Sequence, residues 1–202
     1  IAWTIETCLS INSIERVIVS TDSKKIASIS KKYGAEVPFL RSKNLSDNLT
    51  PVHKATLNAA QMLEKKKNFK VKNVVQLMPN CPYRNFKDIK KFFNFFVKNR
   101  LDFLISCSSS PFLNPWWSFI YKNRKIKKLF PKAYKKRSQD LNEILMPSGA
   151  IWIAKKKELE IKKTFYTKNT KFLFLNWKSA IDIDTSTDYK IAKYLLDSNN
   201  KI

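Results

Sequence analysis

The chain has 202 residues, of which 44% are hydrophobic and 13% aromatic, which suits one domain with a sizeable core but not two. No apolar run approaches the roughly 18 residues of a membrane helix and no signal peptide opens the chain, so we expect a cytoplasmic protein. The formal net charge is +23, yet nearly all of the 39 basic residues are lysines spread along the chain, which favours solvated faces and small anionic ligands over nucleic acid.

Apolar runs and helical periods alternate along the chain. We expect strands at residues 15–20, 71–79, 101–110, 149–154 and 179–184. We expect helices at residues 24–33, 50–67, 85–99, 155–160 and 187–198. This alternation is typical of an α/β fold with a parallel or mostly parallel sheet covered on both faces. Residues 1–202 thus form one predicted domain, with an irregular extension rich in Pro, Trp and Lys at residues 111–147.

Polar residues, proline and glycine mark the ends of two predicted helices. Asp22 or Ser23 is suited to cap the first helix, and Gly34 to end it in the left-handed conformation. Thr50 is a candidate N-cap of the second helix, with Pro51 at its first helical position. These signals support the helix boundaries given above.

The residue types also limit the kind of metal site. The three cysteines, Cys8, Cys81 and Cys107, are far apart in the sequence and form no CxxC pair, and His53 is the single histidine. Neither a disulfide framework nor a zinc site is therefore indicated. A metal ion in this chain would be held by oxygen ligands, which points to Mg²⁺ or a similar hard cation.

Polar groups follow several of the predicted strands, where ligands bind in sheets of this kind. In the stretch "SAIDIDTSTDYKIA", Asp182 and Asp184 alternate with two isoleucines, so in an extended segment both carboxylates point to one side. Two neighbouring carboxylates suit Mg²⁺, but an aspartate just before a helix is also a common cap. The pattern by itself leaves both interpretations open.

Four blocks of the chain, in order, resemble one known family. They are "VIVSTDSKKIASISKKYGAEVPFLR", "QLMPNCPYRNFKDI", "RSQDLNEILMPSGAIWIAK" and "AIDIDTSTDYKIA", and they are similar to the successive blocks of the acylneuraminate (sialic acid-type) cytidylyltransferases. The resemblance implies a three-layer, Rossmann-like nucleotidyltransferase fold and the transfer of CMP from CTP to an acidic nine-carbon sugar for surface glycans or lipopolysaccharide. It also implies Mg²⁺ as cofactor and a homodimer with residues 111–147 at the interface.

The resemblance further implies roles on the reacting side of the site. Asp182 and Asp184 match the family's metal-binding, catalytic carboxylate pair. Arg137 in "RSQD" matches an arginine that faces the sugar or phosphate side of the cleft, and a planar guanidinium suits either anion. Gln139 completes that motif and shapes its loop.

The nucleotide end of the site has its own matches in the family. Arg41 in "VPFLR" matches a position used for the pyrimidine, and Thr50 falls near a hydroxyl that touches the nucleotide. Gln76 in "QLMP" matches a residue beside the sugar, and a buried strand glutamine needs a hydrogen-bond partner. Helix capping is the alternative role for Thr50.

The chain departs from the family pattern in two places. Ser148 stands where the family often has asparagine in Asn-Gly-Ala. The chain begins at "IAWTIETCLS", which resembles the segment just after the family's phosphate-binding loop, and its two glycines, Gly34 and Gly149, are accounted for elsewhere. We therefore expect an amino-terminally incomplete copy that alone binds CTP poorly and turns over little.

Two other functions fit parts of the sequence. A metal-dependent glycosyltransferase using Asp182-x-Asp184 would bind a completed nucleotide sugar and would release no pyrophosphate from CTP. A basic nucleic-acid-binding module built on the lysine runs would bind with an affinity that falls steeply with salt.

Overall fold

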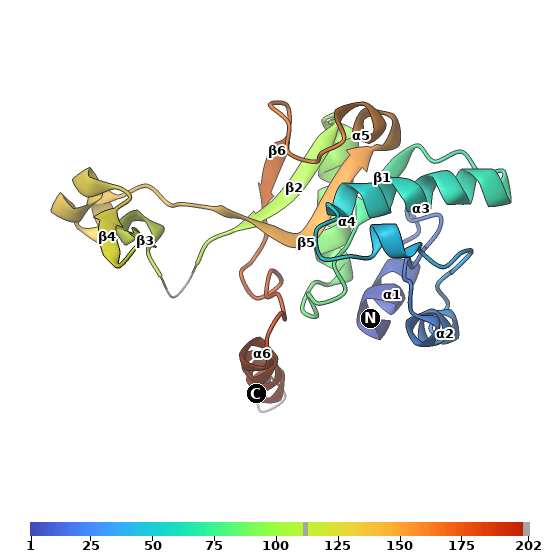
Figure 1. Cartoon of the computed structure of the whole chain (residues 1–202), viewed down its shortest axis with the longest axis horizontal. Coiled ribbons are helices and arrows are strands. Elements are labelled where there is room, and N and C mark those ends of the chain that lie inside the picture. The colour runs from blue at the N-terminus through green and yellow to red at the C-terminus, as the bar shows by residue number, and fades with distance from the viewer. Residues whose placement is uncertain (111–112, 200–202) are drawn as a thin grey trace.

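The computed structural model describes residues 1–110 and 113–199, and Figure 1 shows helices around a central sheet with a separate hairpin projecting from it. The α-helices are α1 (Ala2–Leu9), α2 (Lys24–Lys32), α3 (Val52–Lys67), α4 (Phe86–Lys98), α5 (Lys156–Lys162) and α6 (Ser186–Asn199). The strands are β1 (Asn73–Gln76), β2 (Phe103–Ser108), β3 (Phe119–Lys122), β4 (Lys125–Lys128), β5 (Met146–Lys155) and β6 (Lys171–Phe174). Short 3₁₀ helices are η1 (Lys43–Leu45), η2 (Pro115–Trp117), η3 (Pro131–Lys135) and η4 (Ser138–Asp140).

The central sheet has four strands in the order β1-β5-β2-β6. β5 pairs antiparallel with both β1 and β2, whereas β2 and β6 pair in parallel. Three strands, β1, β2 and β6, therefore run in one direction and β5 runs against them. The carboxyl ends of these three strands meet at one edge of the sheet, where the sequence predicts the ligand site.

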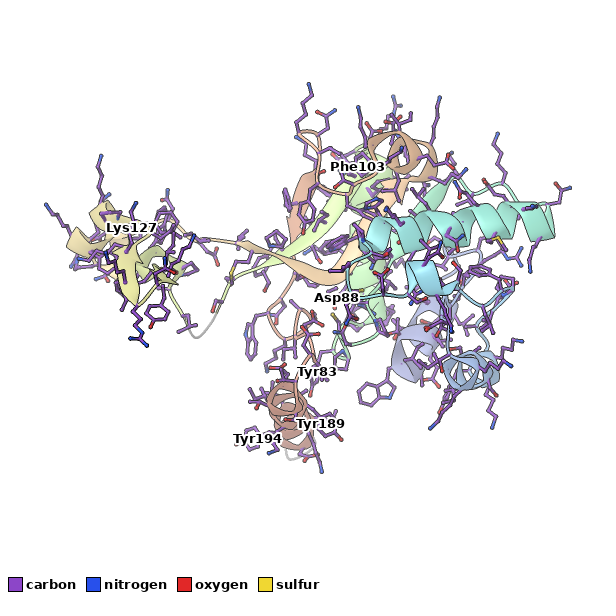
Figure 2. All side chains as sticks on the ribbon, viewed as in Figure 1. Tyr83, Asp88, Phe103, Lys127, Tyr189 and Tyr194 are labelled. Carbon is purple, nitrogen blue, oxygen red and sulfur yellow. The ribbon has the colours of Figure 1, made fainter. Side chains whose placement is uncertain are left out.

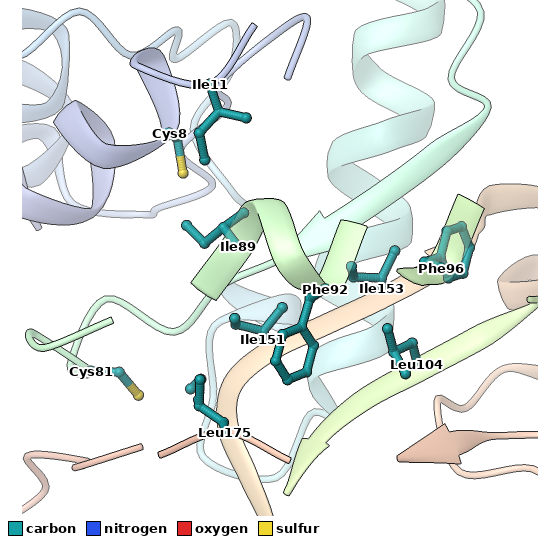
Figure 3. Close-up of a cluster of buried hydrophobic side chains, with 11 residues drawn as sticks. Cys8, Ile11, Cys81, Ile89, Phe92, Phe96, Leu104, Ile151, Ile153 and Leu175 are labelled. Carbon is teal, nitrogen blue, oxygen red and sulfur yellow. The ribbon is translucent and has the colours of Figure 1, made fainter. Parts of the chain in front are cut away.

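Alternating side chains bury both faces of this sheet. On one face, Leu104 of β2 and Ile151 of β5 belong to a cluster that includes Phe92 of α4, and Figure 3 shows this Phe92 pointing toward the strands. On the other face, Phe103 of β2 packs with Leu159 of α5 in a second cluster. Fully burying each such side chain contributes about 1.5–3 kcal/mol. These two cores confirm the predicted three-layer α/β fold.

Helix α4 shows how local signals set one layer. Asn85 and Asp88 form a capping box at its start, with reciprocal side-chain to backbone hydrogen bonds, which satisfies amide groups that the helix leaves unpaired. Ile89, Phe92 and Phe96 are its buried residues, at the spacing of one helical face. The sequence therefore dictates both where α4 begins and which side it turns to the sheet.

Two predicted strands do not form. Residues 15–20 make only one parallel bridge, between Ile18 and Glu36, and residues 179–184 form a turn followed by irregular backbone outside the sheet. A strand needs a hydrogen-bonding neighbour along its length, and an apolar alternation in the sequence does not show whether one is present. Strand β6, in "KFLF", was not predicted, although its apolar and aromatic residues are typical of strands.

The predicted helix caps are partly confirmed. The Ser23 hydroxyl accepts a hydrogen bond from the amide of Ile26 at the start of α2, and Gly34 after α2 has φ +90°. Thr50 does not cap α3, because Pro51 occupies the N-cap position and the Thr50 hydroxyl donates to the carbonyl of Asn44 instead, at 3.3 Å.

The predicted irregular extension contains a β-hairpin. We call residues 113–145 the arm. In Figure 1 the arm stands apart from the sheet, beyond the amino end of β5, and Figure 2 labels Lys127 on it. Strands β3 and β4 are joined at Asn123 and Arg124, which both have positive φ (52° and 58°), as the tightest hairpin turns require. Residues 111 and 112 of the predicted extension, and residues 200–202, lie outside the described residues.

No helix in the described part of the chain is long and apolar enough to cross a membrane.

Candidate active site

The predicted carboxylates lie beside the loop that follows β1, residues 79–84, hereafter the β1 loop. The backbone amide of Ile183 donates to the carbonyl of Asn80 at 3.0 Å. The Asn80 side-chain amide donates to Asp184 Oδ1 at 3.0 Å, and the Cys81 thiol lies 3.8 Å from Asp182 Oδ1. Residues about 100 positions apart in the sequence therefore meet at the edge where strands β1, β2 and β6 end.

Neither carboxylate of the pair caps helix α6. The Thr185 amide donates to Asp188 Oδ2 at 2.8 Å, and the Asp188 amide donates to the Thr185 hydroxyl at 3.2 Å. This reciprocal pair is a capping box, and it also lowers the pKa of Asp188. Thr185 and Asp188 thus cap the helix, so the capping role considered for Asp182 and Asp184 is excluded, and their metal role stays a prediction.

The environment of Asp182 disfavours its charged form. Partial burial raises the pKa of Asp182, and the neighbouring charge of Asp184 raises it further. A bound cation would relieve both effects, because it favours the ionised form of each carboxyl. The pair therefore suits a divalent cation better than it suits the unliganded state.

The pair alone is an incomplete coordination shell. Among residues 1–110 and 113–199, no group of three or more His, Cys, Asp or Glu side chains is arranged to hold a metal ion. Mg²⁺ commonly binds through one or two carboxylates together with substrate phosphates and water. Asp182 and Asp184 fit that pattern, in which the nucleotide supplies the remaining oxygens.

Strand β5 approaches Asp182 through a glycine. A Cβ atom on Gly149 would lie 3.3 Å from Met78 Cγ, which is a tight contact, and 3.6 Å from Asp182 Oδ2, which is ordinary van der Waals contact. The β2–β5 register shifts between Ile105 and Cys107, and such bulges re-aim strand residues beside active sites. Gly149 thereby lets the strand backbone come close to the carboxylate pair.

Ser106 holds this irregularity in place. It is fully buried, and its hydroxyl accepts from the amide of Ile151 at 3.0 Å and lies 2.8 Å from the Ser148 hydroxyl. The Ser148 side chain, which stands where the family often has asparagine, is therefore engaged with β2. Its hydroxyl stabilises the bulge.

Arg84 holds the β1 loop against strand β5 and helix α1. Its guanidinium donates to the carbonyls of Ala150 at 2.6 Å and Met78 at 3.1 Å, and to the Thr4 hydroxyl at 3.0 Å. The residue is only 4% exposed, and burial lowers its pKa. Arg84 thus fastens the loop, through two backbone carbonyls and one hydroxyl.

The thiol and phenol of the same loop have structural partners. Burial, followed by the charge of Asp182, raises the pKa of Cys81 to about 12, so the thiol is protonated at neutral pH and is a poor nucleophile. The Tyr83 hydroxyl donates to the carbonyl of Ala192 in α6, and Figure 2 shows Tyr83 beside that helix. The β1 loop therefore holds both α6 and the segment that carries the carboxylates.

The predicted nucleotide residues form a second group. Arg41 donates to the Ser46 hydroxyl at 2.9 Å and lies 4.0 Å from Asp22 Oδ1, and its amide donates to the carbonyl of Thr21 at 2.8 Å. Thr50 lies at the end of the same loop, and its amide donates to Asp47 Oδ1 at 2.6 Å. The structure thus brings the loop of Arg41 to residues 21 and 22, which follow the predicted strand at residues 15–20.

Gln76 is the last residue of β1. Its side-chain oxygen is buried and has no hydrogen-bond partner within the described residues, and the same is true of the Ser20 hydroxyl. Buried polar atoms without partners are uncommon in folded proteins and often mark ligand sites. Gln76 ends strand β1 and Ser20 ends the predicted strand at residues 15–20.

Arg137 and Gln139 are not brought to the carboxylate pair within one chain. Both lie on the arm, where Arg137 is 74% exposed at its side chain and pairs with Asp140 at 2.9 Å. The sequence could not show this separation, because a local motif does not report where the chain carries it. Sequence reasoning gave no specific role to Asn80, whose signal was its position just after a strand, and it knew Gly149 only as part of Ser-Gly-Ala.

Comparisons with known proteins identify the family of this chain. A family model described as "Cytidylyltransferase" matches residues 1–92. A pseudaminic acid cytidylyltransferase of Campylobacter jejuni is 27% identical over 201 residues, covering 100% of this chain and 86% of the relative. A CMP-N,N'-diacetyllegionaminic acid synthase of Legionella pneumophila is 31% identical over 208 residues, with the same coverage of 100% and 86%.

A solved structure confirms the fold independently. CMP:2-keto-3-deoxy-manno-octonic acid synthetase, complexed with CTP, superposes with a TM-score of 0.67 at 12% identity over 98% of this chain and 87% of that one. At so low an identity the likeness supports the nucleotidyltransferase fold, while the sequence relatives carry the family assignment. This chain is therefore a nucleotidyltransferase that belongs to the acylneuraminate (sialic acid-type) cytidylyltransferase family.

Proposed function

We propose that this protein transfers CMP from CTP to the anomeric hydroxyl of a sialic acid-type nonulosonic acid. The hydroxyl oxygen forms a bond to the α-phosphorus, the bond between that phosphorus and the bridging oxygen of the β-phosphate breaks, and pyrophosphate leaves while the hydroxyl proton is lost to solvent. The proposal rests mainly on the Asp182–Asp184 pair. Neither carboxylate caps α6, and both lie near the edge of the sheet where strands β1, β2 and β6 end.

The names of the relatives suggest the acceptor. They act on pseudaminic acid and N,N'-diacetyllegionaminic acid, which are acidic nine-carbon sugars of the sialic acid type. We therefore propose an acceptor of this class, with a carboxylate and several hydroxyl groups. CTP is a cytoplasmic nucleotide, so the proposed place of action is the cytoplasm.

Mg²⁺ is the proposed cofactor, held by Asp182 and Asp184. When bound it would neutralise charge on the CTP phosphates, which supports attack on the α-phosphorus. The chain's own contribution is positioning: Asn80 and Cys81 contact the two carboxylates, and Gly149 leaves the space beside Asp182 without a side chain. Precise placement of reacting groups accounts for much of the catalysis in phosphoryl-transfer enzymes.

The remaining predicted residues receive roles in the same proposal. Arg41 and Thr50, which lie on one loop, would face the nucleotide base and sugar. Gln76, whose side-chain oxygen is buried without a partner, would accept a hydrogen bond from a substrate hydroxyl. We assign Arg137 and Gln139 to the acceptor side through a homodimer, in which the arm of one copy reaches the other.

The hairpin of the arm supports such an interface. Tyr121 and Ile126 are opposite each other in the β3–β4 register, and they are 70% and 67% exposed. Apolar side chains this exposed on a projecting hairpin are suited to an interface. Ile126→Lys should shift a dimer to monomer in analytical ultracentrifugation. The control Ile161→Lys, which changes a comparably exposed isoleucine of α5 (57%), should not. If both variants behave alike, the arm is not part of the interface.

Pyrophosphate release from CTP tests the proposed reaction. The assay uses the protein with CTP, and with N-acetylneuraminate, legionaminic acid or pseudaminic acid as acceptor. Asp184→Asn should lower turnover by about a hundredfold or more across Mg²⁺ concentrations, as the loss of a key electrostatic group does.

The control removes a carboxylate elsewhere. Asp102→Asn changes a surface carboxylate that pairs with Lys155 at 2.7 Å, at the amino end of β2 and away from the ligand edge, and it should leave turnover unchanged. If Asp184→Asn turns over CTP like the parent, the two carboxylates have no role in the reaction and only belong to the segment that precedes α6. Consumption of a nucleotide sugar without any pyrophosphate from CTP would instead support the glycosyltransferase alternative.

A further inference from the structure

Asn80 makes a two-point attachment to the segment that carries the carboxylates. Its backbone carbonyl accepts from the amide of Ile183 at 3.0 Å. Its side-chain Nδ2 donates to Asp184 Oδ1 at 3.0 Å and lies 3.5 Å from the carbonyl of Ile183. Backbone and side chain of one residue thus fix both the position of the segment and the direction of the Asp184 carboxylate.

The other end of this amide has no partner. Asn80 Oδ1 is buried and accepts no hydrogen bond from any described residue. Turning the amide over would not help, because Oδ1 would then face the Asp184 carboxylate, and an oxygen cannot donate to it. The contact with Asp184 therefore sets the orientation of the amide and leaves a buried acceptor unsatisfied, which costs stability.

Such an arrangement is expected where function outweighs stability. A residue that served only to support the fold would gain by losing the unsatisfied oxygen, since replacing it with an apolar side chain removes the penalty. Two carboxylates two residues apart in one segment repel each other when both are ionised. A donor is needed to keep Asp184 from turning away from its neighbour.

We propose that Asn80 is a positioning residue for the cation site: its side-chain amide holds Asp184 in the direction required to share a divalent cation with Asp182. This inference rests on the proposed function, since it assumes that the pair binds the cation. It deepens that proposal by naming the neighbouring side chain on which the geometry of the pair depends. Outer hydrogen-bond partners of metal ligands commonly control metal affinity by ten- to a hundredfold.

The test measures Mn²⁺ binding directly rather than turnover. Electron paramagnetic resonance reports free Mn²⁺, and titrations are run on the 202-residue chain with Mn²⁺ alone and with Mn²⁺ and CTP. Asn80→Ala should raise the Mn²⁺ dissociation constant by about tenfold or more. Its urea midpoint should stay equal to that of the parent or rise, because the variant loses the unsatisfied oxygen together with the contact.

The matched control is Asn99→Ala. Asn99 also donates through Nδ2, to the carbonyl of Phe95 at 2.8 Å at the end of α4, but it touches neither carboxylate. This variant should leave Mn²⁺ binding unchanged and lower the urea midpoint slightly. The two asparagine variants are therefore expected to show opposite patterns.

Each remaining outcome counts against part of the argument. If Asn80→Ala binds Mn²⁺ like the parent, Asn80 does not position the pair, while the cation site itself stands. If Asn80→Ala loses stability as well as Mn²⁺, the residue is part of the scaffold and the proposal is wrong. If the parent binds Mn²⁺ no better than Asp184→Asn does, the cation site fails and the role of Asn80 fails with it.

Discussion

Replacing Arg84 with methionine tests the anchor behind the candidate site. The guanidinium joins the β1 loop to β5 and α1 through hydrogen bonds of 2.6, 3.1 and 3.0 Å. Methionine fills a similar volume but donates no hydrogen bond. The carbonyl of Ala150, a residue with no exposed surface, would then lose this donor.

The expected loss follows from opposing contributions. A hydrogen bond from a charged donor contributes about 1.5–3 kcal/mol net, so three of them set an upper limit of roughly 5–9 kcal/mol. Removing the buried cation offsets part of this, because its desolvation and its unpaired Nε atom both cost free energy. We expect Arg84→Met to lose about 2–4 kcal/mol, which corresponds to a decrease of roughly 5–15 °C in Tm for a chain of this length.

Thermal and urea unfolding followed by circular dichroism measure this loss. Arg137→Met is the matched control, because it makes the same chemical change at a side chain that is 74% exposed and paired with Asp140. Exposed pairs contribute about 0–1 kcal/mol, so the control should unfold close to the parent. If Arg84→Met also unfolds at the parent's temperature, the hydrogen bonds of Arg84 only offset the cost of desolvating its guanidinium. The anchoring role assigned to it is then wrong.

Two further predictions concern titrating groups. Burial and a neighbouring charge raise the pKa of Asp182, so its favourable contribution to folding is present below the ordinary pKa of 3.8 and is lost as pH rises through the raised pKa. In urea unfolding, Asp182→Asn should therefore be more stable than the parent at pH 7, and the difference in stability should disappear toward pH 3.8. A variant that is less stable than the parent at pH 7 would contradict this. Burial raises the pKa of Cys8 to about 11 and that of Cys81 to about 12, so stability should fall as pH rises from 9 toward 12, and less so in Cys81→Ala. Iodoacetamide should modify neither thiol in the folded chain at pH 8; rapid modification would show that these sites open locally.

Local patterns predicted most of the fold because they record which side of an element is buried. The spacing of Ile89, Phe92 and Phe96 predicts α4 and its buried face, and the structure confirms both. Residues 15–20 were predicted wrongly as a strand for a complementary reason. Their β-branched side chains suit a strand, but a strand also needs a paired neighbour, and only Ile18 makes a bridge.

The candidate site shows the same division at the level of single residues. The alternation of Asp182 and Asp184 predicted that both carboxylates point the same way, but it could not exclude helix capping. That decision came from Thr185 and Asp188, which form the cap between themselves. Several neighbouring side chains can cap the same helix, and only the tertiary structure shows which of them forms the hydrogen bonds.

By itself, the sequence determined the α/β class, the three layers and the cytidylyltransferase resemblance, because hydrophobic period and motif order are properties of the chain. Only the tertiary structure decided that Asn80 holds Asp184, that Gly149 makes room beside Asp182, and that Arg137 stands on a projecting arm. These facts depend on contacts between segments as much as about 100 residues apart. No local pattern encodes such contacts, since they arise only when the β1 loop, the β5 bulge and the segment before α6 pack together.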